Sequence, residues 1–483
     1  MAKEKVNTKV ALNPDMPSPE LDKITLTPAQ KSKGLISFII FSIIGLFVFF
    51  GNVTVNGAST TTFGFLYNNC FLDLFGGAIY WILAVIITAN FACHVYFKYI
   101  KKGEVKNAFA DIYANDTFVH TFLFALGAIY AIVYAAVDAG MMAEITMITG
   151  ADTGGSVFPP IVKGVLGIIL VGAVFMPMLL NYGVLEIIGA VLEPLMRPLF
   201  KIPGKAALDA VSSFVSSSSL GVMITNRLWK QDTYTDKEMV AIMTGFSAVS
   251  IGFAQLVIET AGCGDQFVKI YGLSFIMVFI MAFIMIRIPP INKKADKYYS
   301  GREQTAEDLK DAKYTAKTVP LGFERAIKRA GISRGIVKDV TLSLKDAALV
   351  VPQVLTMLSA IGVSAMIIAE YTPIFTWIGY IFQPLLQLLQ VPDAAEIAAC
   401  MPIGIAEMFL PVLIIQGKVA TLAYEARAFV CLVSMCQIIF FSETATVMLA
   451  TKSPISFKEI IICFLERTIL AMPLAAICIH LFF

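Results

Sequence analysis

Nine long stretches of this 483-residue chain are apolar and almost free of charged side chains. Each is long enough to cross about 30 Å of hydrocarbon as a helix, and a helix pairs its own backbone groups where no water is present. We therefore predict an all-α polytopic membrane protein with about nine full spans. The predicted spans are Gly34–Val53, Phe75–Tyr96, Phe118–Val137, Ile161–Leu180, Val240–Ile258, Phe267–Ile286, Ala347–Ile368, Phe429–Leu449 and Ile460–Leu481.

Composition supports this fold class and excludes one class of partner. Hydrophobic residues make up 57% and charged residues 15% of the chain, against roughly 45–50% and about 25% in soluble domains. Membrane lipid is therefore the expected surrounding of most of the surface. The formal net charge of +2 provides no basic field for DNA or RNA, so we expect no nucleic-acid partner.

No sequence motif for a metal, a cofactor or catalysis is present. The eight cysteines lie mostly in apolar runs without a Cys-x-x-Cys pair, and the three histidines are scattered. The sequence has no Walker motif and no Ser/His/Asp, paired-Asp or His-Glu-x-x-His arrangement. We expect no metal site, no cofactor and no enzymatic activity.

The distribution of lysine and arginine predicts the orientation. Lys31 and Lys33 precede the first span, and alternation of the spans places the basic segment from Arg287 to Lys345 on the same side. By the positive-inside rule this side is the cytoplasm, so we expect a cytoplasmic N-terminus and a location in the inner membrane. About thirty polar residues precede the first span, which argues against a cleavable signal.

The same pattern divides the chain into regions. We predict a cytoplasmic tail (1–33), a three-span region (34–137) and a charged cytoplasmic loop (289–344) with one or two solvated helices. Two longer segments, 159–288 and 345–483, lie on either side of that loop.

Two neighbouring stretches do not have the pattern of simple spans. The stretch 183–200 carries Glu186 and Glu193 on an apolar helix and ends at two prolines, so it should lie in the interface or break early. The stretch 204–230 contains two helix-like halves around Ser216–Ser219, and each half is too short to cross a membrane. We predict a re-entrant hairpin at 204–230.

A similar layout returns later in the chain. Gln383–Pro384 aligns with Glu193–Pro194 about 190 residues earlier, and a second hairpin is predicted at 393–417 with its break at Pro402–Gly404. Three spans separate the two hairpins. Because three is an odd number, the two copies should be inverted relative to the membrane, as in many secondary transporters. The alternative is that both segments are kinked, tilted helices packed in a bundle.

Several motifs resemble those of a known membrane family: Val157-Phe-Pro-Pro-Ile-Val-Lys-Gly164, the run from Ile187 to Gly204, and Gly245-Phe-Ser-Ala-Val-Ser-Ile251. The chain is similar to YjiH-like membrane proteins, which carry two copies of the nucleoside-recognition, or Gate, domain. The resemblance implies Gate repeats at 159–288 and 345–483. It also implies a distant relationship to concentrative nucleoside transporters, which combine two re-entrant hairpins with a cation gradient and an elevator-like motion.

Polar side chains near the predicted breaks are candidates for binding a solute. The serines at the tip of the first hairpin form a dense hydroxyl cluster in apolar surroundings. Hydroxyls and freed backbone groups at a helix break can bind Na+ or a polar solute, whereas serine is also common where helices pack closely. The candidate solute-binding residues are Ser216, Ser217, Ser218, Ser219, Asn226, Gln437, Ser442 and Thr444.

Carboxylates inside apolar segments are candidates for ion coupling. Glu407 follows the second predicted break, and Glu443 lies within the eighth intact span. A charged group at the bilayer centre costs about 2.5–3.5 kcal/mol and usually pairs with a partner or moves ions or protons. We assign coupling to Na+ or H+ to Glu407, Glu443 and Asp209. The alternative for Glu443 is an ion pair with Arg467.

Together these features predict a secondary active transporter. It would move a small polar organic solute, nucleoside-like, amino-acid-like or similar, coupled to Na+ or H+, by elevator-like alternating access. The Gln-Thr-Glu and Asn-Glu-Phe motifs that bind nucleosides in the related transporters have no clean match here. The alternative is a non-transporting membrane scaffold or signalling partner whose charged loop binds a cytoplasmic protein. A homo-oligomer is compatible with both.

Overall fold

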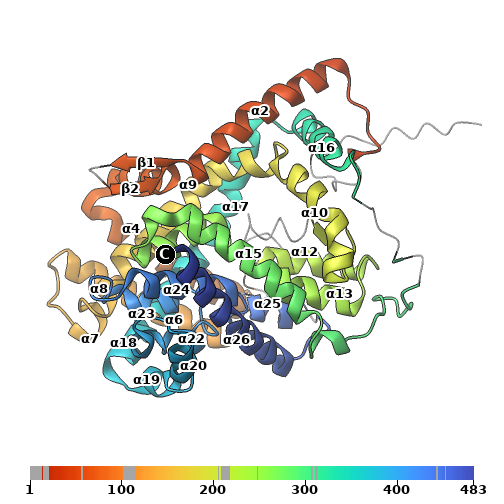
Figure 1. The fold of residues 1–483 in the computed structure, drawn as a ribbon. Helices are drawn as coiled ribbons and strands as arrows, with labels where there is room; N and C mark the ends of the chain where they lie inside the picture. Colours follow the sequence, from red (N-terminus) through yellow and green to blue (C-terminus); the bar gives the residue numbers. More distant parts are fainter. Residues whose placement is uncertain are drawn as a thin grey trace, which may run out of the picture.

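The structure is a computed structural model that describes most of the chain. The described residues are mostly helical, and the named strands among them form one two-stranded antiparallel sheet (Figure 1). The predicted all-α fold class is confirmed. The described residues are 14, 21–55, 58–101, 113, 116, 118–204, 206–207, 218–246, 249–305, 308–309, 314–441, 444–451 and 453–483.

Eight helical segments in the described part of the chain are long and apolar enough to cross a membrane. Each of them contains or overlaps one of the predicted spans. The predicted span Phe429–Leu449 has no such counterpart because its helix is divided. The eight segments are Pro28–Phe50, Thr62–Ile100, Phe118–Asp138, Thr146–Leu180, Asp236–Thr260, Gly264–Met285, Ile336–Tyr371 and Phe457–Phe482.

The N-terminal part of the chain forms three long helices, α2, α4 and α6. α2 begins at a capping box, in which the Thr27 hydroxyl accepts from the Gln30 N–H and the Gln30 side chain accepts from the Thr27 N–H. β1 and β2 form a hairpin in which Asn52 pairs with Thr61. The elements are α2 (Pro28–Phe50), β1 (Asn52–Val55), β2 (Ala58–Thr61), α3 (Thr62–Phe65), η1 (Leu66–Phe71), η2 (Leu72–Ala78), α4 (Ile79–Val95), η3 (Tyr96–Ile100) and α6 (Phe118–Asp138).

A sharp corner separates α9 from α10. Gly183 at this corner has a φ of +106°, and a Cβ there would lie 2.6 Å from the Cβ of Ala326 in α16, so only glycine suits the position. α10 runs on through Pro194 and Pro198 to Phe200 without breaking. The elements of this part are α7 (Thr146–Thr149), α8 (Gly154–Val157), η4 (Phe158–Val162), α9 (Lys163–Leu180), α10 (Val184–Phe200) and α12 (Ser218–Lys230).

Helix α16, from the predicted charged loop, packs against both α2 and α10 (Figure 1). A Cβ on Gly34 of α2 would lie 2.3 Å from the carbonyl oxygen of Ile327, which shows how closely the two backbones approach. One face of α16 therefore packs against the protein while Val319, Phe323 and Glu324 stay exposed, and the predicted cytoplasmic loop stays a prediction. The surrounding elements are α15 (Phe267–Met285), η7 (Ile291–Lys293), α16 (Thr318–Ile332), α17 (Ile336–Met357), η8 (Leu358–Gly362) and α18 (Val363–Tyr371).

The predicted span Val240–Ile258 is not a continuous α-helix. Its first half is described as far as Phe246, residues 249–250 are not helical, and its second half begins at Ile251 after Ser250 in an extended conformation. Hydropathy did not reveal this interruption because the link between the halves, 247–250, is short and uncharged and both halves are largely apolar. We call α13, η5 and α14 together the first broken helix. Its parts, with the short helix that follows, are α13 (Asp236–Ala241), η5 (Ile242–Phe246), α14 (Ile251–Thr260) and η6 (Gly264–Gln266).

The predicted span Phe429–Leu449 is interrupted as well. Its first half ends at Gln437, and Ile438 then adopts a φ of +34°, which turns the chain out of the helix. The second half begins at Thr444. We call these two halves the second broken helix. They are α24 (Tyr424–Gln437) and α25 (Thr444–Ala450), and they are followed by α26 (Phe457–Phe482).

The segment that contains the predicted second hairpin, 393–417, is built from short helices that pack into the same hydrophobic core as α24. A non-helical turn at 404–409 separates its last two helices. The re-entrant and inverted arrangement of the two hairpins stays a prediction. The short helices are α19 (Ile374–Gly379), α20 (Gln383–Leu388), α21 (Ala394–Ile397), α22 (Cys400–Ile403) and α23 (Leu410–Gln416).

Candidate functional site

The interruption of the second broken helix lies against the turn 404–409. The Phe441 N–H donates to the carbonyl of Ile405 at 2.8 Å, and the Ser434 hydroxyl donates to the carbonyl of Met408 at 2.5 Å. Each interruption therefore satisfies backbone groups that the other has freed. We call the turn 404–409, together with the end of α24 and the residues that follow it (434–441), the break site. It lies within the apolar core and holds the buried polar side chains of Glu407, Ser434 and Gln437.

Glu407 lies within the turn of the break site. Its side chain is buried, with 8% of the residue exposed, and its carboxylate accepts a hydrogen bond from the Phe409 N–H at 3.3 Å. The helix before the turn runs to Ile403, so the break comes slightly later than the predicted Pro402–Gly404. A buried carboxylate in irregular backbone can hold a cation or take up a proton.

Gln437, at the end of α24, connects the break site to two other elements. Its Nε2 donates to the carbonyl of Met401 at 2.5 Å and to the Thr468 hydroxyl at 2.9 Å. Its Oε1 is buried and has no hydrogen-bond partner among the described residues. A Cβ on Gly404 would lie 2.0 Å from that oxygen, so the amide occupies the space that the missing side chain leaves.

Arg467, in the middle of α26, joins the two broken helices and is completely buried. Its Nε donates to the carbonyl of Cys436 in α24 at 2.6 Å. Its Nη1 donates to the carbonyls of Thr244 and Gly245 in η5, at 2.5 Å and 3.2 Å. Its Nη2 has no hydrogen-bond partner in the described part of the chain.

The sequence suggests Arg467 only as an alternative partner for Glu443. The signal that could have singled it out is a permanently charged side chain in the middle of an apolar span. Among the described residues, no carboxylate forms an ion pair with Arg467; its partners are main-chain carbonyls. Glu443 itself lies outside the described residues, so its pairing is not tested.

Asn226 lies away from the break site. Its Nδ2 donates to the carbonyl of Thr451 at 3.2 Å and to the Ser453 hydroxyl at 3.4 Å, just after α25. A cavity of about 350 Å³ opens beside it, between the end of α12 and the end of α25. The lining residues are Asn226, Arg227, Lys230, Gln231 and Thr451.

The remaining predicted site residues give less information. Thr444 is buried at the first position of α25, next to the break site. Ser218 and Ser219 lie in the first turn of α12, and their side chains are outside the described part. The predictions for all of these residues stay predictions. Those outside the described residues altogether are Asp209, Ser216, Ser217, Ser442 and Glu443.

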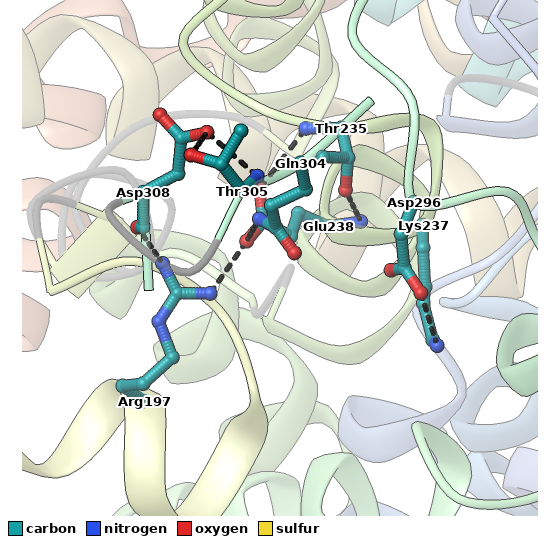
Figure 2. A network of polar contacts seen from close by, with 8 residues as sticks. All are labelled: Arg197, Thr235, Lys237, Glu238, Asp296, Gln304, Thr305 and Asp308. Atoms are coloured by element: carbon teal, nitrogen blue, oxygen red, sulfur yellow. Dashed lines mark hydrogen bonds and ion pairs between the residues drawn. The ribbon is translucent and has the colours of Figure 1, made fainter. Parts of the chain in front are cut away.

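A charged network holds the start of the first broken helix (Figure 2). Glu238 in α13 forms an ion pair with Arg197 of α10 at 2.6 Å and accepts from Gln304 at 2.9 Å. Glu238 also completes a capping box with Thr235, whose N–H donates to the carboxylate at 3.0 Å. The network therefore fixes α13 to α10 and to the segment that follows α15.

A second set of ion pairs binds α16 to its neighbours. Arg325 donates to Asp22 at 2.7 Å and to Glu193 of α10 at 2.9 Å. Arg329 donates to Glu186 of α10 at 2.7 Å. Glu186 and Glu193 of α10 are therefore paired with two arginines of the charged loop within the molecule.

Comparisons with known proteins agree with the predicted resemblance. The Gate family model, described as nucleoside recognition, matches residues 162–263, which include α12 and the first broken helix. The uncharacterized protein BpOF4_10220 of Alkalihalophilus pseudofirmus is 32% identical over 471 residues, which cover 95% of this chain and 96% of that protein. The resemblance to Gate-containing membrane proteins is confirmed.

Solved structures of CNTnw also align with this chain. CNTnw in an inward-facing substrate-bound state aligns over 94% of this chain and 99% of that chain, with 12% identity and a TM-score of 0.45. A doubly substituted variant in an outward-facing state aligns over the same shares, with 11% identity and a TM-score of 0.45.

Proposed function

This chain belongs to the same family as BpOF4_10220 of Alkalihalophilus pseudofirmus, and from that premise, together with its Gate segment, we propose that it is a secondary active transporter. Its cargo is a small polar organic solute, nucleoside-like, amino-acid-like or similar. Transport is coupled to Na+ or H+ and proceeds by elevator-like alternating access.

The break site is the observation that carries this proposal. Irregular backbone at membrane depth is tolerated only where protein or a polar cavity satisfies it, and transporters place their solute and ion sites at such interruptions. Here the interruption of the second broken helix is hydrogen-bonded to the turn 404–409, which contains the buried carboxylate of Glu407. A purely structural bundle would be more stable with continuous helices and without a buried carboxylate.

The proposal gives each candidate residue a role. Glu407 and Glu443 carry the linkage to the cation, with Asp209 as a third acidic candidate. Gln437 and Thr444, at the second broken helix, contact the solute together with Ser442. Ser216 to Ser219 and Asn226 contact it from the first predicted hairpin. A scaffold role has less support because Arg325 and Arg329 of the charged loop already pair within the molecule.

Uptake into proteoliposomes tests this function. Purified protein is reconstituted and supplied with radiolabelled nucleosides, amino acids and dipeptides under a Na+ gradient, a pH gradient or neither. We expect at least one solute to accumulate only with a cation gradient, and Glu407→Gln and Glu443→Gln to abolish that dependence.

Glu396→Gln is the matched control, because Glu396 is an exposed carboxylate of the same segment that pairs with Lys418. It should transport like the wild type. Cation-driven uptake that persists unchanged in Glu407→Gln and Glu443→Gln would contradict the assigned roles. Absence of uptake for every solute, with no ligand-dependent thermal stabilisation, would favour the scaffold.

A further inference from the structure

The first halves of the two broken helices end at the same place inside the protein. Thr244 and Gly245 lie in the last turn of η5, and Cys436 lies in the last turn of α24. The last carbonyls of a helix have no partner within that helix, and they need donors when they are buried. Each C-terminal end also carries the equivalent of about −0.5 elementary charge, so two converging ends bring about −1.

Converging carbonyls of this kind form a cation site. In secondary transporters, unwound backbone carbonyls and the C-terminal ends of half-helices coordinate the coupling ion. In this protein the guanidinium of Arg467 occupies the place where the two ends meet. Its Nε reaches Cys436 at 2.6 Å, and its Nη1 reaches Thr244 at 2.5 Å and Gly245 at 3.2 Å.

The charges at this point balance without a carboxylate. The guanidinium carries +1, which matches the sum of the two helix ends. Arg467 is fully buried and is fixed to α26, which packs along α24. A side chain held in this way cannot dissociate as a free ion does.

We propose that Arg467 is a built-in cation that takes the place of a coupling ion at the broken helices. The carbonyls of both helix ends are then satisfied at all times without bound Na+. The coupling ion of the proposed transporter is thereby confined to the carboxylates. This inference uses the proposed function only to name the ion that Arg467 replaces, and its test does not require transport.

The test is chemical rescue, measured as thermal unfolding of purified protein in detergent. Arg467→Ala removes the charge and leaves a space, whereas Arg467→Met removes the charge and fills much of the space. We expect both variants to lose on the order of 5 °C or more in Tm. Millimolar guanidinium chloride should raise the Tm of Arg467→Ala toward the wild-type value in a saturable way. Tetramethylammonium chloride at the same ionic strength should not. Neither salt should raise the Tm of Arg467→Met, because the methionine side chain fills much of the space.

Arg427 provides a matched control. Its Nη1 also donates to carbonyls at a helix end, those of Ala261 and Gly262 at 3.0 Å and 2.9 Å, but only one helix ends there. Arg427→Ala should lose less stability, and guanidinium should not rescue it. Arg467→Lys keeps the charge and should remain more stable than Arg467→Met, which provides a test even where Arg467→Ala does not fold.

Two outcomes would overturn the inference. One is that Arg467→Met is as stable as Arg467→Lys, since the side chain would then contribute volume and not charge. The other is a folded Arg467→Ala that guanidinium does not stabilise beyond the effect of tetramethylammonium. Failure of uptake in proteoliposomes would leave both measurements unaffected, so the inference and the proposed function fail separately.

Discussion

Arginines stabilise two regions of this molecule in different ways. At the broken helices, Arg467 is completely buried and all its bonds end on main-chain carbonyls. On α16, Arg325 is nearly as buried, with 5% exposed, but its bonds end on the carboxylates of Asp22 and Glu193. The buried carbonyl contacts of Arg467 lie far from salt, whereas the carboxylate contacts of Arg325 are partly exposed and are screened by salt. The contacts in the interior should therefore tolerate salt better than those of the α10–α16 face.

The largest expected effect is at the break site. Gly404→Ala would place a Cβ 2.0 Å from the Oε1 of Gln437, whose amide is held in place by Met401 and Thr468. Overpacking of this kind costs about 1–3 kcal/mol, and we expect the upper end because the amide cannot move without losing both hydrogen bonds. Thermal unfolding in detergent measures the loss.

Gly417→Ala is the control for that variant, because nothing lies within 4 Å of a Cβ at Gly417. It should unfold at the wild-type temperature. Equal stability of the two alanine variants would show that the break site is loosely packed and would weaken the contrast with the α10–α16 face.

Arg325→Met should give the next largest effect. It leaves Asp22 and Glu193 without their cation, and we expect a loss of about 1–2 kcal/mol, reduced from the cost at a fully buried pair because both carboxylates are partly exposed. The difference from wild type should shrink at high salt, whereas the effect of changing Arg467 should not.

Lys328→Met, on the same helix, removes a cation that pairs with the largely exposed Glu324 and should change little. Denaturation measured at low and high salt distinguishes these cases. An Arg325 effect that is independent of salt would mean that its burial, and not its ion pairs, stabilises α16.

Thr235→Ala tests the link between the two regions. Thr235 is the N-cap of α13, where the first broken helix begins, and its loss also removes half of the capping box with Glu238. We expect a loss of about 1 kcal/mol. Thr341→Ala, at an exposed position of α17, should be close to neutral. Equal effects of the two substitutions, measured by thermal unfolding, would contradict a capping role.

The smallest effect should be the acid response of an exposed pair. The Arg302 guanidinium, together with the Thr305 N–H and hydroxyl, holds the pKa of the Asp308 carboxyl well below its usual range. A lowered folded-state pKa stabilises the protein above the unfolded value of about 3.9, and that contribution is lost as the pH falls through the folded pKa. Tm measured from neutral pH down to pH 3 and below should therefore fall less steeply in Asp308→Asn than in wild type.

Glu303→Gln removes a more exposed carboxylate of the same segment and provides the comparison. Its acid profile should follow that of the wild type. A change in slope as large as that of Asp308→Asn would indicate a general charge effect and not the Arg302 pair.

Much of the fold could be predicted from the sequence, because apolar length alone identifies helices that cross a membrane. The interruption at Gln437 could not, since the residues that follow it, Ile438 to Phe441, are as apolar as a continuous span. The position of Glu407 at a helix break could be predicted, because it follows a proline and a glycine. The role of Arg467 could not, because its partners are carbonyls that lie 31 and more than 220 residues away in sequence.

The guanidinium of Arg467 determines which helices are held together as one unit. The hydrogen bonds of Arg467 connect α26 to α24 and to η5. These three helices therefore form one unit, because separating them would leave a buried charge without partners. Under the proposed alternating-access mechanism, relative movement would then take place outside this unit, as where α14 meets α9. Under that proposal, a crosslink between α24 and α26 should leave transport intact, whereas one between α14 and α9 should block it.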